Sequence, residues 1–178
     1  DISGQAMPKP NTELIFEFVR QKSWQQALGM FRATRRRRLE PDVATQNAAI
    51  GACATGAKWQ DALGMLSDMQ ASRQEPTPVT YIVALSACDK GARWQDAAGI
   101  LSEMQACLAE PGVVTYSAAM SACNKAGRWH EALAVFSDMR ARDVEPNVVS
   151  YNTAMSACST GARWQEALDL FWDLPRRH

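Results

Sequence analysis

Apolar residues in this chain recur at the spacing of amphipathic helices. In residues 113–125 they stand at i, i+3, i+4 and i+7, as Tyr116, Ala119, Met120 and Cys123. A second apolar stripe follows, made up of Trp129, Ala132, Leu133, Phe136 and Met139. Because these intervals place side chains on one face of a helix, the pattern predicts two helices joined by a short turn. No segment alternates between apolar and polar residues as a half-buried strand does.

The helix pair repeats with a period of thirty-five residues. The tryptophan that opens the second stripe returns at Trp24, Trp59, Trp94, Trp129 and Trp164. Together with a proline of the same period, it divides the chain into an extension at 1–7, a degenerate unit at 8–42, full units at 43–77, 78–112 and 113–147, and a partial unit at 148–178. Because one helix pair cannot bury both of its apolar stripes, we predict an all-α fold, an α-solenoid of stacked helix–turn–helix repeats in a right-handed superhelix.

Other residues of the same period mark helix ends and surfaces. Asp42, Thr77 and Asn147 are the expected N-caps of first helices, and Gly112 is the weak member of that series. One glycine breaks the pattern between the two helices of each unit, at Gly56, Gly91, Gly127 and Gly161. Four cations stand three residues before an acid, which favours surface ion pairs: Lys58, Arg93, Arg128 and Arg163. Four second-helix acids are expected to face solvent on the outer surface: Asp68, Glu103, Asp138 and Asp173.

Composition narrows the classes of function. Lys and Arg together number 19, as do Asp and Glu, so the net charge is zero and does not by itself indicate nucleic-acid binding. No apolar run reaches membrane-spanning length. Cysteines at one repeat position, with no CxxC pair, are expected to be small buried core residues rather than metal ligands or disulfides: Cys53, Cys88, Cys123 and Cys158. No catalytic, cofactor or small-molecule motif stands out, and His130 is expected on the surface.

The segments VTYSAAMSACNKAGRWHEALAVFSDM and VSYNTAMSACSTGARWQEALDLFWDL resemble pentatricopeptide repeats of the P type. The period, the Val-Thr-Tyr opening and the terminal proline carry the resemblance, which is strong over 43–178 and weak over 8–42. The tryptophan stands where the family usually has an aliphatic residue, a variant similar to that of algal protist members. The resemblance implies binding of single-stranded RNA in a plastid or mitochondrion, at about one base per repeat.

In that family the fifth and last residues of a unit select the base, and the second residue packs on it. Carried across, Ser117 with Asn147 resembles a pair that prefers a purine, most often adenine, and Asn47 with Thr77 resembles a pyrimidine reader. Ile82 with Gly112 offers no hydrogen-bonding side chain, and Asn152 has no partner before the last residue, His178. The resemblance also gives packing roles to Val79, Val114 and Val149, and phosphate contacts to Lys90 and Lys125.

Helix geometry reaches the same surface independently, because positions two, five, nine, twelve and thirteen of the first helix share the side opposite the core stripe. These residues are mostly small and polar, which fits either a ligand groove or a plain exposed helix face.

A second function remains open, a protein–protein scaffold in an organellar ribosome, photosystem or respiratory assembly. The neutral charge favours it, and so does Trp172, which replaces Ser67, Ser102 and Ser137 of the other units. The charge run Arg35, Arg36, Arg37 and Arg38 is either an anchor for phosphate or an acidic partner, or a solvated helix end.

Overall fold

The structure is a computed structural model that describes residues 10–21, 23–36, 41–107 and 109–174. In these residues it consists of helices, with no strand. The helices are α1 (Pro10–Arg20), α2 (Trp24–Arg36), α3 (Val43–Thr55), α4 (Trp59–Ala71), α5 (Pro78–Lys90), α6 (Trp94–Ala106), α7 (Val113–Lys125), α8 (Trp129–Ala141), α9 (Val148–Thr160) and α10 (Trp164–Asp173). Consecutive helices pair as hairpins, and the predicted helix pairs are all present. The degenerate N-terminal unit also forms one, α1 with α2.

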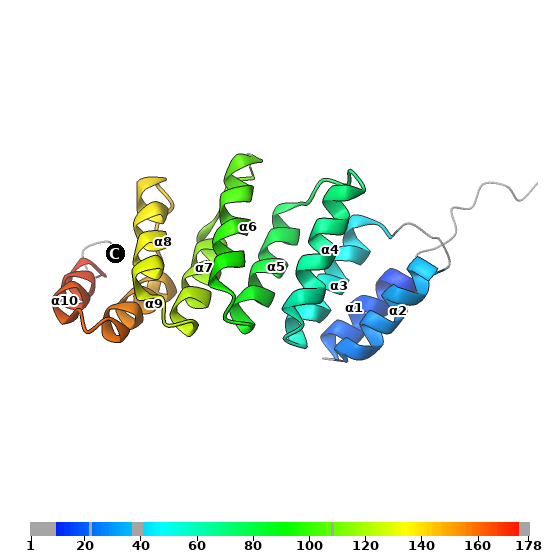
Figure 1. Ribbon diagram of the computed structural model, residues 1–178, viewed down its shortest axis with the longest axis horizontal. Coiled ribbons are helices and arrows are strands. Elements are labelled where there is room, and N and C mark those ends of the chain that lie inside the picture. The colour runs from blue at the N-terminus through cyan, green and yellow to red at the C-terminus, as the bar shows by residue number, and fades with distance from the viewer. Residues whose placement is uncertain (1–9, 22, 37–40, 108, 175–178) are drawn as a thin grey trace, which may run out of the picture.

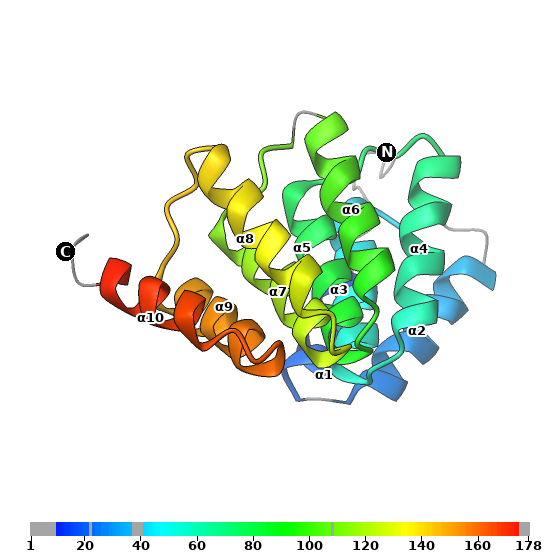
Figure 2. The same ribbon diagram turned by 60° about the vertical axis from the view of Figure 1, so that its left-hand side comes forward.

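The hairpins stack in chain order from α1–α2 at one end to α9–α10 at the other (Figure 1). Each first helix packs on the first helix of the next hairpin, so α1, α3, α5, α7 and α9 form one layer. Each second helix packs on its own first helix, and α2, α4, α6 and α8 also pack on the first helix of the following hairpin, so the second helices form a second layer (Figure 2). The predicted α-solenoid is thus confirmed.

The first helices supply the centre of the core. Tyr81, Tyr116 and Tyr151 are buried with at most 2% of their surface exposed. The four periodic cysteines, Cys53, Cys88, Cys123 and Cys158, are buried and unpaired in disulfides, as predicted. Burial raises the pKa of the Cys53 thiol to about 12, so this group stays a neutral, small apolar side chain.

Three N-caps are confirmed. The side chain of Asp42 accepts from Thr45 N at 2.8 Å, and that of Asn147 accepts from Ser150 N at 3.0 Å. Thr77 forms a reciprocal capping box with Thr80. Gly112 has no side chain to cap α7, and there the backbone N–H of the glycine donates to Thr115 Oγ1 at 3.2 Å.

The turns inside the hairpins differ from the predicted pattern at one unit. Gly56, Gly91 and Gly161 follow their first helices directly with ordinary negative φ angles. Gly127 stands one residue later, in the left-handed conformation with φ of 69°, where the other units have Ala57, Ala92 and Ala162. The four glycines therefore do not share one role, and the first three are needed for space rather than for φ.

That space is occupied by the tryptophan of the preceding repeat. A Cβ atom on Gly56 would lie 2.6 Å from Trp24 Cδ2, and one on Gly91 would lie 2.5 Å from Trp59 Cδ1. Gly161 is in the same position against Trp129, at 2.5 Å. Van der Waals contact requires more than 3 Å, so these indole rings lie directly on glycine backbone.

A cation of the following repeat covers each of these rings. Lys58 Nζ lies 5.7 Å from the Trp24 ring centroid, and the guanidinium carbons of Arg93, Arg128 and Arg163 lie 4.0, 4.5 and 5.6 Å from the rings of Trp59, Trp94 and Trp129. The three arginines also pair with the acid three residues on, which confirms three of the four predicted ion pairs. Each arginine therefore joins its own helix to the preceding repeat through a cation–π contact. Asp61, the acid expected to pair with Lys58, lies 3.7 Å from an Arg32 guanidinium nitrogen.

The prediction that the second-helix acids face solvent holds for Asp68, which is exposed, and is wrong for Glu103, Asp138 and Asp173, which are half-buried. Glu103 and Asp138 accept from the hydroxyls of Tyr81 and Tyr116, each at 2.9 Å, and Asp173 accepts from Tyr151 at 3.0 Å. Each acid also contacts the preceding repeat, in the pairs Arg35–Asp68, Gln70–Glu103, Gln105–Asp138 and Arg140–Asp173. Buried tyrosine hydroxyls need a hydrogen-bond partner, and the acids supply it at every one of these three tyrosines.

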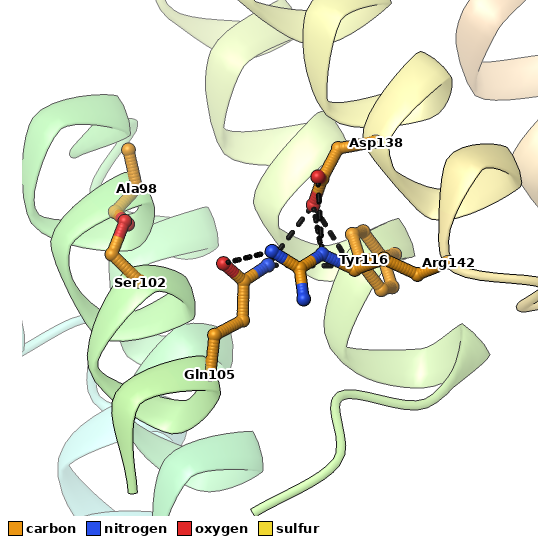
Figure 3. Close-up of polar contacts among 6 residues, drawn as sticks. All are labelled: Ala98, Ser102, Gln105, Tyr116, Asp138 and Arg142. Atoms are coloured by element: carbon orange, nitrogen blue, oxygen red, sulfur yellow. Dashed lines mark hydrogen bonds and ion pairs between the residues drawn. The ribbon is translucent and has the colours of Figure 1, made fainter. Parts of the chain in front are cut away.

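The best-connected of these contacts surrounds Asp138 (Figure 3). Gln105 Nε2 donates to Asp138 Oδ2 at 2.9 Å, and Arg142 Nε donates to Asp138 Oδ1 at 3.1 Å. Arg142 also donates to Gln105 Oε1 at 3.0 Å, which closes the network between α6 and α8. Desolvation acts to raise the pKa of Asp138, but the hydrogen bonds from Tyr116, Arg142 and Gln105 outweigh it and lower that pKa.

Gly91→Ala is expected to lower the free energy of unfolding by about 1 kcal/mol, because the added methyl group displaces Trp59. We expect only a moderate effect, because unit 113–147 already has an alanine, Ala126, at the position equivalent to Gly91 and still forms its helix pair. Gly99→Ala is the control, since a Cβ there meets nothing within 4 Å, and it should stabilise helix α6 by about 0.5–1 kcal/mol. Urea unfolding of both variants measures this, and equal effects would contradict the role of glycine at the turn.

Asp138→Asn is expected to lower the free energy of unfolding at neutral pH by about 1 kcal/mol, because the charge that receives Tyr116 and Arg142 is lost. Since the folded-state pKa of Asp138 is lowered, its contribution is present above the unfolded value of about 4 and is lost as the pH falls through the folded value. The difference in the free energy of unfolding between the native chain and Asp138→Asn should therefore become smaller below about pH 4. Urea midpoints across the acid range test this, and a constant gap would contradict it.

Candidate functional site

The groove face, defined as positions two, five, nine, twelve and thirteen of the first helices, has two exposed edges. At position two, Val79, Val114 and Val149 are 55%, 62% and 57% exposed. At position thirteen, Lys90 and Lys125 are also exposed. Because the two positions lie at opposite ends of each helix, the face has an apolar edge at the helix N-termini and a partly cationic edge at the C-termini.

Between these edges the polar residues of the inner units are half-buried. Asn47 Nδ2 donates to Thr77 Oγ1 at 3.4 Å, and the hydroxyls of Ser117 and Ser150 lie 3.1 Å apart. Each contact joins one first helix to the start of the next. The neighbouring repeat therefore covers part of this row in these units. Asn152, in α9, is exposed.

Hydrogen bonds connect the two residues in two of the predicted reading pairs. Asn47 bonds directly to Thr77, whereas Ser117 reaches Asn147 through Ser150, whose hydroxyl donates to Asn147 Oδ1 at 3.1 Å. Asn147 Oδ1 also accepts from Ser150 N as the helix cap, so the amide nitrogen is the group left to meet a ligand. Ile82 is half-buried and Gly112 exposed, and neither brings a polar side chain.

The sequence analysis missed a buried hydroxyl at position three of the units, which bonds to the capping side chain of the same helix. Position three of every unit from 43 onward carries Thr45, Thr80, Thr115 or Ser150, each at most 3% exposed. The hydroxyl of Thr45 bonds to the capping side chain Asp42, and that of Ser150 bonds to Asn147. The period of thirty-five would have revealed this position, because a hydroxyl recurs there in an otherwise apolar opening.

The two lysines of the groove face differ in their surroundings. Lys125 Nζ lies 2.7 Å from Asp89 Oδ2, across the contact between α7 and α5. Lys90 is exposed at the end of α5. The predicted phosphate contacts therefore start from one lysine already paired with a carboxylate and one that faces solvent.

The predicted arginine cluster is divided. Arg35 pairs with Asp68 at 2.6 Å and belongs to the inter-repeat contacts, so the interpretation of a free helix end does not hold for it. Arg36 is exposed at the end of α2, and Arg37 and Arg38 lie outside the described residues.

An end surface of α10 gathers large apolar residues, Trp164, Leu168, Phe171 and Trp172, which are 49–66% exposed. Phe136, the counterpart of Phe171 one repeat earlier, is only 4% exposed because it packs against Tyr151 of the next hairpin. Beside the end surface Met155, Cys158, Ala162 and Ala167 line a shallow hollow together with three of its members. The sequence singled out Trp172 alone, because only that residue departs from its counterparts.

Two classes of site find no support in the residues that the structure describes. No group of three or more His, Cys, Asp or Glu side chains is placed to hold a metal ion. None of the helices described is long and apolar enough to span a membrane. His130 is exposed and stacks on Trp129.

Three repeat models match the sequence. A pentatricopeptide repeat domain model matches residues 29–91, a PPR repeat family model matches 111–160, and a PPR repeat model matches 149–178. No curated protein matches the chain.

Solved structures share the fold. The pentatricopeptide repeat protein PPR10 from maize is 27% identical with a TM-score of 0.71 over 93% of this chain, and its complex with an 18-nt psaJ RNA element is 23% identical with a TM-score of 0.73 over 99%. The PPR domain of Arabidopsis thaliana protein-only RNase P 1, in complex with tRNA, has a TM-score of 0.78 at 13% identity and covers 91% of this chain. The chain spans only 24% and 29% of the two PPR10 chains, and 86% of the Arabidopsis domain.

Proposed function

We propose that this chain, which belongs to the pentatricopeptide repeat family, binds single-stranded RNA along the groove face. The observation that carries the proposal is the order of that face, with exposed valines at one edge, lysines at the other and capping polar groups near the valines. Bases stack on apolar side chains and phosphates attract cations, so the face offers both in the order a nucleotide strand needs.

The proposal gives each residue a role. Val79, Val114 and Val149 pack on bases, and Lys90 and Lys125 lie near phosphates. In unit 113–147, Ser117 and the amide nitrogen of Asn147 meet a base edge, which favours adenine by the family resemblance. Asn47 with Thr77 favours a pyrimidine, Ile82 with Gly112 accepts a base without reading it, and Asn152 contributes an exposed amide.

The proposed role is binding, without catalysis, in RNA metabolism of a plastid or mitochondrion. Two solved structures of similar fold support RNA as the ligand, since the maize protein was solved with an RNA element and the Arabidopsis domain with tRNA. With stacking worth about 1–3 kcal/mol per base and association costs of several kcal/mol, the few repeats of this chain should bind in about the micromolar range.

Lys90→Ala is expected to weaken binding to a pool of short single-stranded RNAs about two- to five-fold at low salt, and to reduce the slope of log affinity against log salt by about 0.7. Arg32→Ala removes the same charge from the outer helix α2, where Arg32 makes only an exposed contact with Asp61, and serves as the control. Fluorescence anisotropy at several salt concentrations measures both. If the full chain leaves every RNA unbound at tens of micromolar, the proposed function is wrong.

A second candidate function, the protein scaffold of an organellar ribosome, photosystem or respiratory assembly, is favoured by the end surface of α10. Trp164 and Phe171 occupy positions that the next hairpin covers elsewhere, which suits a helical hairpin of a partner. Trp172 is different, because Ser67, Ser102 and Ser137 at its position remain exposed beside a following repeat. A partner surface is thus the role in which an indole at this position is useful.

Trp172→Ser is expected to leave the free energy of unfolding within about 0.5 kcal/mol of the native value, because it restores the residue of the inner repeats at an exposed site. It should also reduce any concentration-dependent association of the chain, measured by sedimentation velocity, since the surface loses an exposed indole. Phe136→Ser is the control that destabilises, by about 3 kcal/mol or more. A loss of stability in the Trp172 variant would mean that the indole packs on its own chain. Trp172 would then not contribute to partner binding at the end surface of α10.

A further inference from the structure

The cationic edge of the groove face contains an acid at one position. Position thirteen carries Thr55, Lys90, Lys125 and Thr160, and position twelve, one residue earlier, carries Ala54, Asp89, Asn124 and Ser159. Asp89 is the one charged residue among these four position-twelve residues. Its carboxylate lies 2.7 Å from Lys125 Nζ of the next repeat.

The carboxylate of Asp89 is largely buried beside Lys125. Its side chain is only 20% exposed, and Oδ1 is buried with no hydrogen-bond partner among the described residues. Asn124, at the same position in the next unit, donates from Nδ2 to the backbone oxygen of Thr153 at 2.7 Å. A carboxylate cannot donate, so Asp89 lacks that bond and depends on Lys125 for compensation of its charge.

We propose that Asp89 is a negative determinant of RNA affinity, which holds Lys125 in an intramolecular ion pair and so removes it from the phosphate-binding edge. This inference rests on the proposed function and concerns the same groove face. A phosphate that approaches Lys125 must replace the carboxylate of Asp89 and also meets its negative charge. The contact lies beside the unit whose reading positions are Ile82 and Gly112, so the unit with the paired lysine adjoins the unit without a polar reading side chain.

Asp89→Asn tests the proposal, because it removes the charge and keeps the shape. The asparagine can donate to the neighbouring backbone as Asn124 does, so the fold should be retained. At low salt we expect about two- to five-fold tighter binding of a pool of short single-stranded RNAs, and a slope of log affinity against log salt steeper by about 0.7, since Lys125 becomes available to a phosphate. Asp89→Ser, the residue type at position 159, is a second variant should the first unfold.

Two controls separate this effect from a general change of charge. Asp169→Asn makes the same change at an exposed position of α10 and should leave the affinity unchanged within about two-fold. The double variant Asp89→Asn, Lys125→Ala should bind no more tightly than Lys125→Ala alone, because the gain runs through Lys125.

The outcomes distinguish the two proposals. Absence of RNA binding by every variant would remove the proposed function. Binding by the native chain that Asp89→Asn leaves unchanged, or a gain that persists without Lys125, would overturn the role of Asp89 and leave the RNA groove standing. A gain that requires Lys125 and is absent in the Asp169 variant would establish it.

Discussion

Neighbouring repeats in this solenoid meet where an indole ring lies under a cation of the next repeat and, at three of the four contacts, directly on a glycine of the next turn. The ring fills the volume that a Cβ atom would take, as at Gly56 against Trp24 and at Gly91 against Trp59. The cation adds a polar rim, and its own helix supplies an acid that fixes its position. Because the contact joins positions separated by almost one period, it constrains how far and at what angle each hairpin stands from the next.

The first helices therefore pack in direct contact, and this determines what the groove face can offer. Side chains at positions five and twelve reach the next helix, as Ser117 does toward Ser150 and Asn124 toward Thr153, so much of their hydrogen-bonding capacity serves the fold. In α3, α5 and α7 the exposed residues of the groove face are those at the helix ends, at position two and position thirteen, whereas in α9 Asn152 is exposed as well. A ligand on this face meets an apolar edge and a polar edge separated by a partly satisfied row, which suits a strand of stacked bases with a phosphate backbone.

The sequence predicted features that act within one repeat and missed those that act between repeats. Helix positions, the N-caps Asp42, Thr77 and Asn147 and the buried cysteines follow from local periodicity and capping chemistry, and they are confirmed. The partners of the acids do not follow in this way. Asp138 bonds to Tyr116 and Gln105, residues 22 and 33 positions earlier, and that choice depends on the angle at which hairpins stack. For the same reason the sequence showed Arg35 as an end of a helix and not as the partner of Asp68.

The same stacking explains why net charge is a poor guide to ligand binding in such a chain. Arg93, Arg128 and Arg163 cover tryptophan rings and pair with their own acids, and Arg35 and Arg140 join acids of the next repeat. These cations are already neutralised by the contacts that hold the solenoid together, so they add little to the field over the groove face. In the proposed RNA complex, the charge that a phosphate meets is set by the residue at position thirteen and by any acid that pairs with it, as Asp89 pairs with Lys125. Under the proposed function, affinity for RNA grows with the number of repeats and with the lysines at position thirteen, and the other cations named above serve the fold.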